Sequence, residues 1–286
     1  MKTAVVTGTS TGIGFETALH LARNGYQVKA AMRNLGKSEA IKKAASDEGL
    51  NLEVILMDVN SDTSVTEAFA AITEPVDVLV NNAGVGGATP LELTPMDEHK
   101  ATFETNYFGA VRCIQAVLPS MRERTQGCIV NITSMEGIVA MPNQVAYSAS
   151  KWALECLGEA LAHEMVRFGV RVVNVEPGVI MTQIFDNSAE MTRYDKTSPY
   201  QPLMRRNGKM FMAGFKEGIS ANVVAETILE SIETDTYKLR WPVGSDAKTL
   251  SVGRKKISDE DWVAMGENLS DEEYNSRYME YFGIQL

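Results

Sequence analysis

Strand-like and helix-like runs alternate along most of this chain, and this alternation restricts the fold more than any other feature. Apolar runs typical of buried strands occur at residues 3–7, 27–32, 52–57, 76–80, 128–132 and 170–175. Helix-like runs lie between them, at residues 37–48, 62–73, 96–122 and 146–168 among others. Strands and helices in this order form a parallel sheet that is covered on both faces. We therefore expect an α/β fold with three layers and a doubly wound parallel sheet.

The first expected strand runs into a glycine-rich turn that opens a helix. The turn contains Gly8, Ser10, Thr11, Gly12, Ile13 and Gly14. Backbone N–H groups at a helix start attract an anion, and glycine lets a phosphate group approach closely. A glycine pattern alone would indicate only a tight turn, but its place between a strand and a helix predicts a nucleotide-binding site.

The ends of the next two strands bear on the choice of nucleotide. The second strand ends at Met32 and Arg33, where many dinucleotide folds carry an acid for the ribose 2′-hydroxyl. An arginine pairs with a 2′-phosphate, so we expect NADP rather than NAD, although a solvated arginine gives the same pattern. Asp58 and Val59 end the third strand, and Asp58 is a candidate for the adenine edge or for a helix cap.

Small and polar residues follow the later strands, at the edge where an open sheet binds ligands. They are Asn82, Ala83 and Gly84 after the fourth strand, Ser134 after the fifth, and Pro177, Gly178, Val179 and Thr182 after the sixth. Asn106 lies inside a helix-like run, where an amide is mildly unfavourable unless it is solvated or has a specific partner.

Tyr147 and Lys151 stand four residues apart in a helix-like run, so their side chains leave the same face. Taken alone, the pair is typical of a surface tyrosine beside a lysine stem. A cation roughly 4 Å from a phenol is worth about 4 kcal/mol at an effective dielectric of about 20, which is about three pKa units. We therefore expect Lys151 to lower the pKa of Tyr147 and to make the phenol a proton donor and acceptor near neutral pH.

Together these residues resemble the short-chain dehydrogenase/reductase family, in its short single-domain branch. The shared pattern is Thr7-Gly8-x3-Gly12-Ile13-Gly14, Asn81-Asn82-Ala83-Gly84, Asn106, Ser134, Tyr147-x3-Lys151 and Pro177-Gly178-x3-Thr182. It covers residues 2–182, with continuity of the fold to about residue 242. The resemblance implies a Rossmann-like sheet. Met32 and Arg33 look like the NADP-preferring hydroxysteroid and retinol dehydrogenases of the family.

The resemblance also implies a role for each matched residue. Tyr147 is then the general acid and base, Lys151 lowers its pKa and holds the nicotinamide ribose, Ser134 binds the substrate oxygen, and Asn106 holds a water of the proton relay. The cofactor-binding set is Gly8, Ser10, Thr11, Gly12, Ile13, Gly14, Arg33, Asp58, Val59, Asn82, Ala83, Gly84, Tyr147, Lys151, Pro177, Gly178, Val179 and Thr182. The implied reaction interconverts a secondary alcohol and a ketone or aldehyde with NADP, and it needs no metal.

We assign residues 1–244 to the Rossmann-like domain, which includes a substrate segment at 179–220. We assign residues 245–286 to a helical extension of the same domain. Capping-box patterns at Ser258 and Ser270 predict two acidic helices in that extension. Family members usually end near the strand before it, so this extension is a departure from the family.

Methionine and phenylalanine recur in the substrate segment and indicate either a deformable apolar pocket wall or ordinary core packing. These residues are Met181, Phe185, Met191, Met204, Met210, Phe211 and Met212. Arg205 and Arg206 either meet an acidic substrate group or, more simply, form a solvated pair. The residues that we expect to contact a small to medium apolar substrate are Ser134, Val139, Met141, Gln144, Met181 and Phe185.

The acidic composition limits the partners. The net charge is −10 and no basic cluster stands against it, so nucleic acid and anionic membrane surfaces are unfavourable partners. No apolar run reaches the roughly 20 residues of a membrane span, and no signal-peptide pattern precedes the first strand, so we expect a cytoplasmic protein.

The cysteines have no metal-ligand spacing, and we expect them to be buried and reduced. Apolar helix faces at 96–122 and 146–168 predict a homodimer or homotetramer.

Two other functions on the same fold stay open at this point. One is a catalytically silent NADP-binding sensor or regulator, which the intact Tyr147 and Lys151 pair disfavours. The other is an epimerase or dehydratase, which usually has a shorter glycine spacing than the three residues between Gly8 and Gly12.

Overall fold

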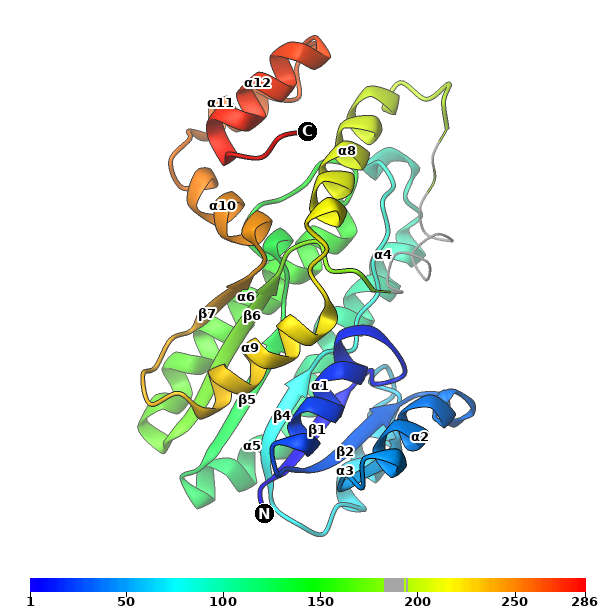
Figure 1. The fold of residues 1–286 in the computed structure, drawn as a ribbon, viewed down its shortest axis with the longest axis vertical. Coiled ribbons are helices and arrows are strands. Elements are labelled where there is room, and N and C mark those ends of the chain that lie inside the picture. The colour runs from blue at the N-terminus through cyan, green and yellow to red at the C-terminus, as the bar shows by residue number, and fades with distance from the viewer. Residues whose placement is uncertain (183–192, 194) are drawn as a thin grey trace.

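Seven parallel strands form one sheet at the centre of the molecule (Figure 1). The computed structural model describes residues 1–182, 193 and 195–286. The strands are β1 (Thr3–Thr7), β2 (Gln27–Met32), β3 (Leu52–Leu56), β4 (Val76–Asn81), β5 (Gly127–Ile132), β6 (Val170–Pro177) and β7 (Arg240–Val243). Their order in the sheet is β3-β2-β1-β4-β5-β6-β7, and all neighbours pair in parallel.

The chain reverses its direction of winding between β1 and β4, which are neighbours in the sheet. It first proceeds outward from β1 to β3 and then returns to add β4 to β7 on the other side. At such a switch point the loops after the two strands separate, and the carboxyl ends of the strands form a crevice for a ligand. The expected doubly wound Rossmann-like fold is therefore confirmed.

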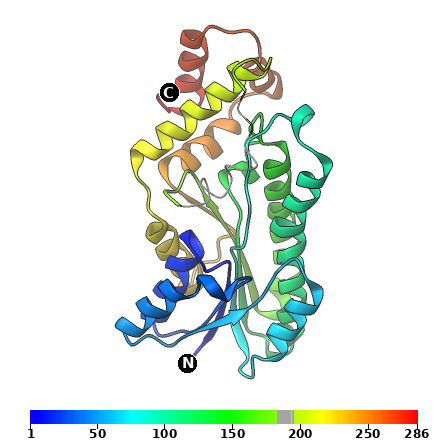
Figure 2. The same cartoon turned by 90° about the vertical axis from the view of Figure 1, so that its right-hand side faces the viewer.

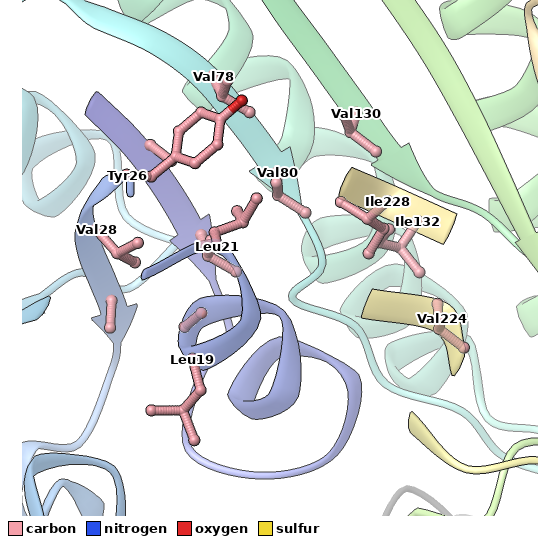
Figure 3. Packing of buried hydrophobic residues seen from close by; sticks show 14 of the residues in the cluster. Leu19, Leu21, Tyr26, Val28, Val78, Val80, Val130, Ile132, Val224 and Ile228 are labelled. Carbon is pink, nitrogen blue, oxygen red and sulfur yellow. The ribbon is translucent and has the colours of Figure 1, made fainter. Parts of the chain in front are cut away.

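Helices cover the two faces of the sheet (Figure 2). The helices are α1 (Gly12–Arg23), α2 (Glu39–Asp47), α3 (Asp62–Ala70), α4 (Met96–Phe103), α5 (Gly109–Arg124), α6 (Val145–Met165), α8 (Gln201–Glu217), α9 (Ala221–Glu233), α10 (Ser245–Arg254), α11 (Asp259–Ala264) and α12 (Asp271–Phe282). One hydrophobic cluster packs α1, α2 and α9 on the sheet, and Figure 3 shows Leu21 of α1 and Ile228 of α9 in it. A second cluster packs α3, α5 and α6 on the opposite face.

Each central strand is apolar along its whole length because both faces of the sheet are covered. In β1, Val6 belongs to the cluster under α1 while its neighbour Val5 belongs to the cluster under α5, and both are fully buried. Alternate side chains of a strand point to opposite faces, so neither face of β1 tolerates a polar run. Each buried valine contributes about 1.5–3 kcal/mol relative to an exposed one.

The helix-like run expected at 96–122 is not one continuous α-helix. A π-helical turn, Glu104–Phe108, separates α4 from α5. Turns of this type are often found at functional sites. Here the turn contains Asn106, whose side chain is almost fully buried and bonds to the loop after β4. The hydrophobic periodicity continues through the turn, which explains why the sequence predicts a single helix.

Helices α8, α10, α11 and α12 form a layer over the carboxyl ends of the strands, at the end of the molecule opposite the N-terminus (Figure 1). A third hydrophobic cluster joins α8, α10 and α12 to the segment that follows β5. The two acidic helices expected after Ser258 and Ser270 are present as α11 and α12. The reciprocal capping box is complete only at Ser270. At Ser258 the hydroxyl accepts the backbone N–H of Asp261, but no return bond to the backbone forms.

Candidate active site

A cavity of about 1310 Å³ lies at the carboxyl ends of the strands, below α8. Nearly all the residues assigned to cofactor binding from the sequence line it; Gly14, which lies behind the turn, does not. These lining residues are Gly8, Ser10, Thr11, Gly12, Ile13, Arg33, Asp58, Val59, Asn82, Ala83, Gly84, Tyr147, Lys151, Pro177, Gly178, Val179 and Thr182. Segments that are up to 170 residues apart in sequence therefore meet at the switch point, since parallel strands bring their carboxyl ends to one edge.

The glycine-rich turn has the geometry of an anion cradle. Gly12 has a φ of +63°, which favours glycine, and a Cβ there would lie 3.3 Å from the Cβ of Thr182 across the crevice. A Cβ on Gly14 would collide with the Asn82 amide and the Gly8 carbonyl. Thr11 precedes the helix without a capping bond from its side chain, so the first N–H groups of α1 face the crevice without that partner. These features fit the pyrophosphate of a dinucleotide.

Asn82 supports this turn from behind. Its amide donates to the carbonyls of Thr7 and Gly8, at 2.8 and 3.1 Å, and its backbone N–H donates to the Thr7 hydroxyl at 3.0 Å. The end of β4 is thereby tied to the end of β1. The side-chain amide is engaged with the protein, so Asn82 shapes the turn and leaves the cavity surface largely to Ala83 and Gly84.

Two exposed cations, Arg33 and Lys37, line the cavity beyond the end of β2. Neither forms an ion pair with any residue in the described part of the chain. Asp58 lines the same end, and its carboxylate accepts the backbone N–H of Asn60 at 3.1 Å. It does not cap α3, because Ser61 is that cap. Lys37 is absent from the sequence-based set, since it follows Arg33 only through an irregular turn.

Tyr147 and Lys151 lie on the first turns of α6 and share the cavity wall with Ser134. The lysine Nζ lies 5.7 Å from the centre of the tyrosine ring. Burial raises the pKa of Tyr147 well above its usual value, the Glu136 carboxyl raises it further, and the Ser134 hydroxyl lowers it. In the protein alone the phenol is therefore not poised near neutral pH, because desolvation and a buried acid favour its protonated form. The expected effect of Lys151 on this pKa stays a prediction.

Lys151 is itself buried, and its ammonium donates a 2.8 Å hydrogen bond to the carbonyl of Ile132 at the end of β5. Burial lowers the pKa of Lys151 to about 8, against the opposing effect of the Glu155 and Glu136 carboxylates. The hydrogen bond to Ile132 thus fixes the position of the side chain. Burial brings the pKa of its ammonium close to neutral pH.

Both the oxygen and the nitrogen of the Asn106 side-chain amide form hydrogen bonds within the protein. It donates to the Val85 carbonyl and the Ser150 hydroxyl, both at 2.9 Å, and accepts the Val85 N–H at 2.8 Å. These bonds join the π-helical turn, the loop after β4 and the helix that carries Tyr147. The described contacts make Asn106 a support for the site.

Glu136 lines the cavity as a buried acid that the sequence did not single out. It lies two residues after Ser134, in a short turn between β5 and α6. Its position in the sequence carries no signal of burial, because the residues that cover it come from α6 and from the extension.

The substrate side differs from the expectation. Ser134 and Gln144 line the cavity, and Phe185 and Met191 lie outside the described residues. Val139 and Met141 are buried in the third hydrophobic cluster, because the extension packs on their loop. Met181 is 56% exposed and does not line the cavity.

Helix α8 forms part of the cavity wall, in the segment where the sequence indicated either an apolar pocket wall or core packing. Its contribution consists of Met204, Arg205, Asn207, Gly208, Lys209, Phe211, Met212 and Lys216. Met210 belongs to the core instead.

The expectation that Arg205 and Arg206 form a solvated pair is wrong for Arg206. This side chain is buried, stacks on Tyr274 at 4.4 Å and donates a hydrogen bond to the Leu269 carbonyl. Arg205 pairs with Asp271.

The comparisons with known proteins agree with this geometry. Residues 2–193 match the family model described as short chain dehydrogenase. The chain belongs to the short-chain dehydrogenase/reductase family. Members of this family are oxidoreductases that bind NAD or NADP, and the glycine turn and the crevice described above fit such a dinucleotide.

Among the relatives in this family is human retinol dehydrogenase 8, which is 44% identical over 186 residues. That match covers 64% of this chain and 60% of the length of the relative. A short-chain dehydrogenase from Streptomyces avermitilis has a similar structure, with a TM-score of 0.80, 31% identity, and coverage of 93% of this chain and 98% of that one. An actinorhodin polyketide ketoreductase variant solved with NADPH has a TM-score of 0.73 and 28% identity, with coverage of 85% and 95%.

The expectations about membrane spans and about the cysteines can be compared directly with the structure. None of the described helices is both long and apolar enough to cross a membrane. Cys113 and Cys128 are buried and free, as expected, whereas Cys156 is free but exposed on α6.

Proposed function

We propose that this protein is an NADP-dependent oxidoreductase that interconverts a secondary alcohol and a ketone or aldehyde. The observation that supports it most is the convergence of Ser134, Tyr147 and Lys151 on a cavity that also contains the glycine-rich turn. A phenol, a hydroxyl and an ammonium beside a dinucleotide crevice supply what proton transfer to a carbonyl oxygen requires, without a metal.

In this proposal the bound nicotinamide supplies or accepts the hydride. The Tyr147 phenol gives its proton to the carbonyl oxygen during reduction and takes it back during alcohol oxidation. Ser134 holds the substrate oxygen beside the phenol, and Lys151 holds the nicotinamide ribose from its fixed position on Ile132. Asn106 anchors the loop and helix around this group and, by resemblance, places a relay water.

The preference for NADP rests on the two exposed cations after β2. Arg33 and Lys37 both line the cavity and both are exposed there. A 2′-phosphate accepts charge-assisted hydrogen bonds from such groups, whereas the ribose hydroxyl of NAD does not need them. The structurally similar ketoreductase solved with NADPH is consistent with this choice.

The substrate in this proposal is small to medium and apolar. Met204, Phe211 and Met212 of α8 present apolar side chains to the cavity that Tyr147 also lines. A homodimer or homotetramer in the cytoplasm completes the proposal. Phe108 and Trp152 are exposed by 45% and 48% on the π-helical turn before α5 and on α6, as a subunit contact would require.

The test is turnover of a panel of ketones and aldehydes with NADPH, followed by the absorbance of the reduced nicotinamide. We expect Tyr147→Phe to lose about 10²–10⁴-fold in kcat/KM while it still binds NADPH. Tyr237→Phe, whose hydroxyl bonds to the Val172 carbonyl far from the cavity, is the control. A Tyr147→Phe protein as active as the wild type would refute the proposed role.

A further inference from the structure

A buried carboxyl group lies in the wall of the cavity, beside the proposed proton donor. Glu136 is 2% exposed. Its backbone N–H donates to the Ser134 hydroxyl at 3.1 Å, and its Oε2 accepts the Ser148 hydroxyl at 2.6 Å. Ser148 in turn accepts the backbone N–H of Met141 at 3.3 Å. The acid is therefore fixed between the loop after β5 and the first turns of α6.

The face of α6 that meets this acid also carries Lys151. Gln144, Ser148, Lys151 and Glu155 follow one another at helical spacing, and all four are buried. The Lys151 ammonium lowers the pKa of Glu136, and the Glu155 and Glu136 carboxylates raise the pKa of Lys151. The Glu136 carboxylate raises the pKa of Tyr147, which precedes Ser148 in the sequence.

The extension closes this site from the other side. Tyr278 of α12 is 1% exposed, and burial raises the pKa of its phenol well above the usual value. The charges of Tyr274, Asp246 and Glu136 raise this pKa further. The Tyr278 hydroxyl has no hydrogen-bond partner in the described part of the chain. Met135, next to Glu136, is buried in the hydrophobic cluster of α10 and α12, so the extension packs on the loop that carries the acid.

We propose that Glu136 is a positioning residue that keeps the Tyr147 phenol protonated and so confines alcohol oxidation to alkaline pH. This inference rests on the proposed function and deepens it. A negative charge held close to a phenol disfavours the phenolate, and here the charge is weakly screened because the carboxyl is buried. The same carboxylate also attracts the Lys151 ammonium, and this reduces the help that the cation gives to the phenolate.

The titration of the acid itself agrees with this role. Burial raises the pKa of Glu136 to about 7, while the Ser148 and Gln144 side chains and the Lys151 charge lower it. The carboxyl therefore gains its charge across the neutral range. Carbonyl reduction, which needs a protonated Tyr147, proceeds on both sides of that range, whereas oxidation needs the phenolate and is opposed once Glu136 is ionised.

The experiment compares pH profiles of kcat/KM for alcohol oxidation with NADP⁺ and for ketone reduction with NADPH. In Glu136→Gln, which keeps an acceptor for Ser148, we expect the oxidation profile to move to lower pH by about one unit. Oxidation at neutral pH then rises about tenfold, because one pKa unit is a factor of ten. Reduction at pH 6 is expected to change little.

Two further variants keep the inference testable. Glu136→Ala is a second neutral variant, for use if Glu136→Gln fails to fold, and it is expected to move the profile in the same direction. Glu136→Asp retains the charge and is expected to keep the wild-type profile. Neutral variants with the wild-type profile overturn the role of Glu136. A wild type that turns over no carbonyl compound overturns the proposed function instead.

Discussion

Lys151 Nζ donates a 2.8 Å hydrogen bond to the backbone carbonyl of Ile132, and this contact fixes α6 to the end of β5. It holds the cation at the cavity wall and satisfies a strand-end carbonyl that the following loop leaves free. One side chain thus serves both the fold and the proposed chemistry.

Replacement of Lys151 is expected to lower both the stability of the fold and the activity. Lys151→Met leaves the Ile132 carbonyl without its donor, at a cost of about 1–3 kcal/mol in the free energy of unfolding. It also removes the cation beside Tyr147, so kcat/KM falls by at least about 10²-fold. Urea unfolding and steady-state kinetics measure the two effects. Lys43→Met on the exposed side of α2 is the control, and a Lys151→Met enzyme with normal kinetics would contradict the assignment.

The two cations after β2 are expected to set the cofactor preference. A charge-assisted bond to a phosphate is worth about 1.5–3 kcal/mol, so Arg33→Ala raises the KM for NADPH about tenfold or more and leaves that for NADH nearly unchanged. Lys37→Ala is expected to act in the same direction. If selectivity between NADPH and NADH stays constant in both variants, these residues do not bind the 2′-phosphate.

Most of the sheet and the cofactor crevice follows from local patterns in the sequence. The expected strand at 27–32 coincides with β2, and the one at 3–7 coincides with β1, because continuous apolar runs and glycine turns mark buried parallel strands. The convergence of Tyr147 with the glycine turn follows from the topology alone.

What the sequence could not predict depends on distant partners. Asn106 lies in a π-helical turn because it bonds to Val85, 21 residues earlier. Val139 is buried in a cluster with residues of α10 and α12, more than 100 residues later, and Glu136 is buried against Ser148 of α6. Helix α8 is obscured in the sequence by Gly208 and by the polar residues around it. Such long-range burial leaves no periodic signal in either partner.

Gly208 is expected to control the size of the substrate. It lies within α8, where glycine is less favourable than alanine by roughly 1 kcal/mol, and it lines the cavity. A Cβ there would meet no atom within 4 Å, so a larger side chain projects into open space. We expect Gly208→Leu to lower kcat/KM for bulky ketones at least tenfold and to spare small ones. Ala213→Leu, which does not face the cavity, is the control; equal losses for all substrates would argue against a size filter.

The exposed apolar residues of α6 and the turn before α5 are expected to lie at a subunit contact. Trp152→Glu places a charge on that surface, and desolvation of an unpaired charge opposes association. We expect the molar mass from light scattering to fall to that of a smaller assembly. Val263→Glu on α11, where Val263 is 74% exposed, is the control and keeps the wild-type mass. An unchanged mass for Trp152→Glu would place the contact elsewhere.

The raised pKa of Glu136 also predicts how stability depends on pH, independently of any activity. Burial raises this pKa from its ordinary value of 4.5 to about 7. An acid whose pKa is raised by folding favours the native state below its unfolded pKa, and this contribution is lost as the pH rises through the folded value. The wild type should therefore lose about 3 kcal/mol relative to Glu136→Gln between pH 4 and pH 8, at about 1.4 kcal/mol per pKa unit. Urea unfolding of both proteins at the two pH values measures this difference, and the raised pKa of Glu176 cancels because both proteins contain it. Glu67→Gln on the exposed side of α3 controls for the loss of a charge. A difference between wild type and Glu136→Gln that does not change with pH would mean that burial does not raise the pKa of this carboxyl.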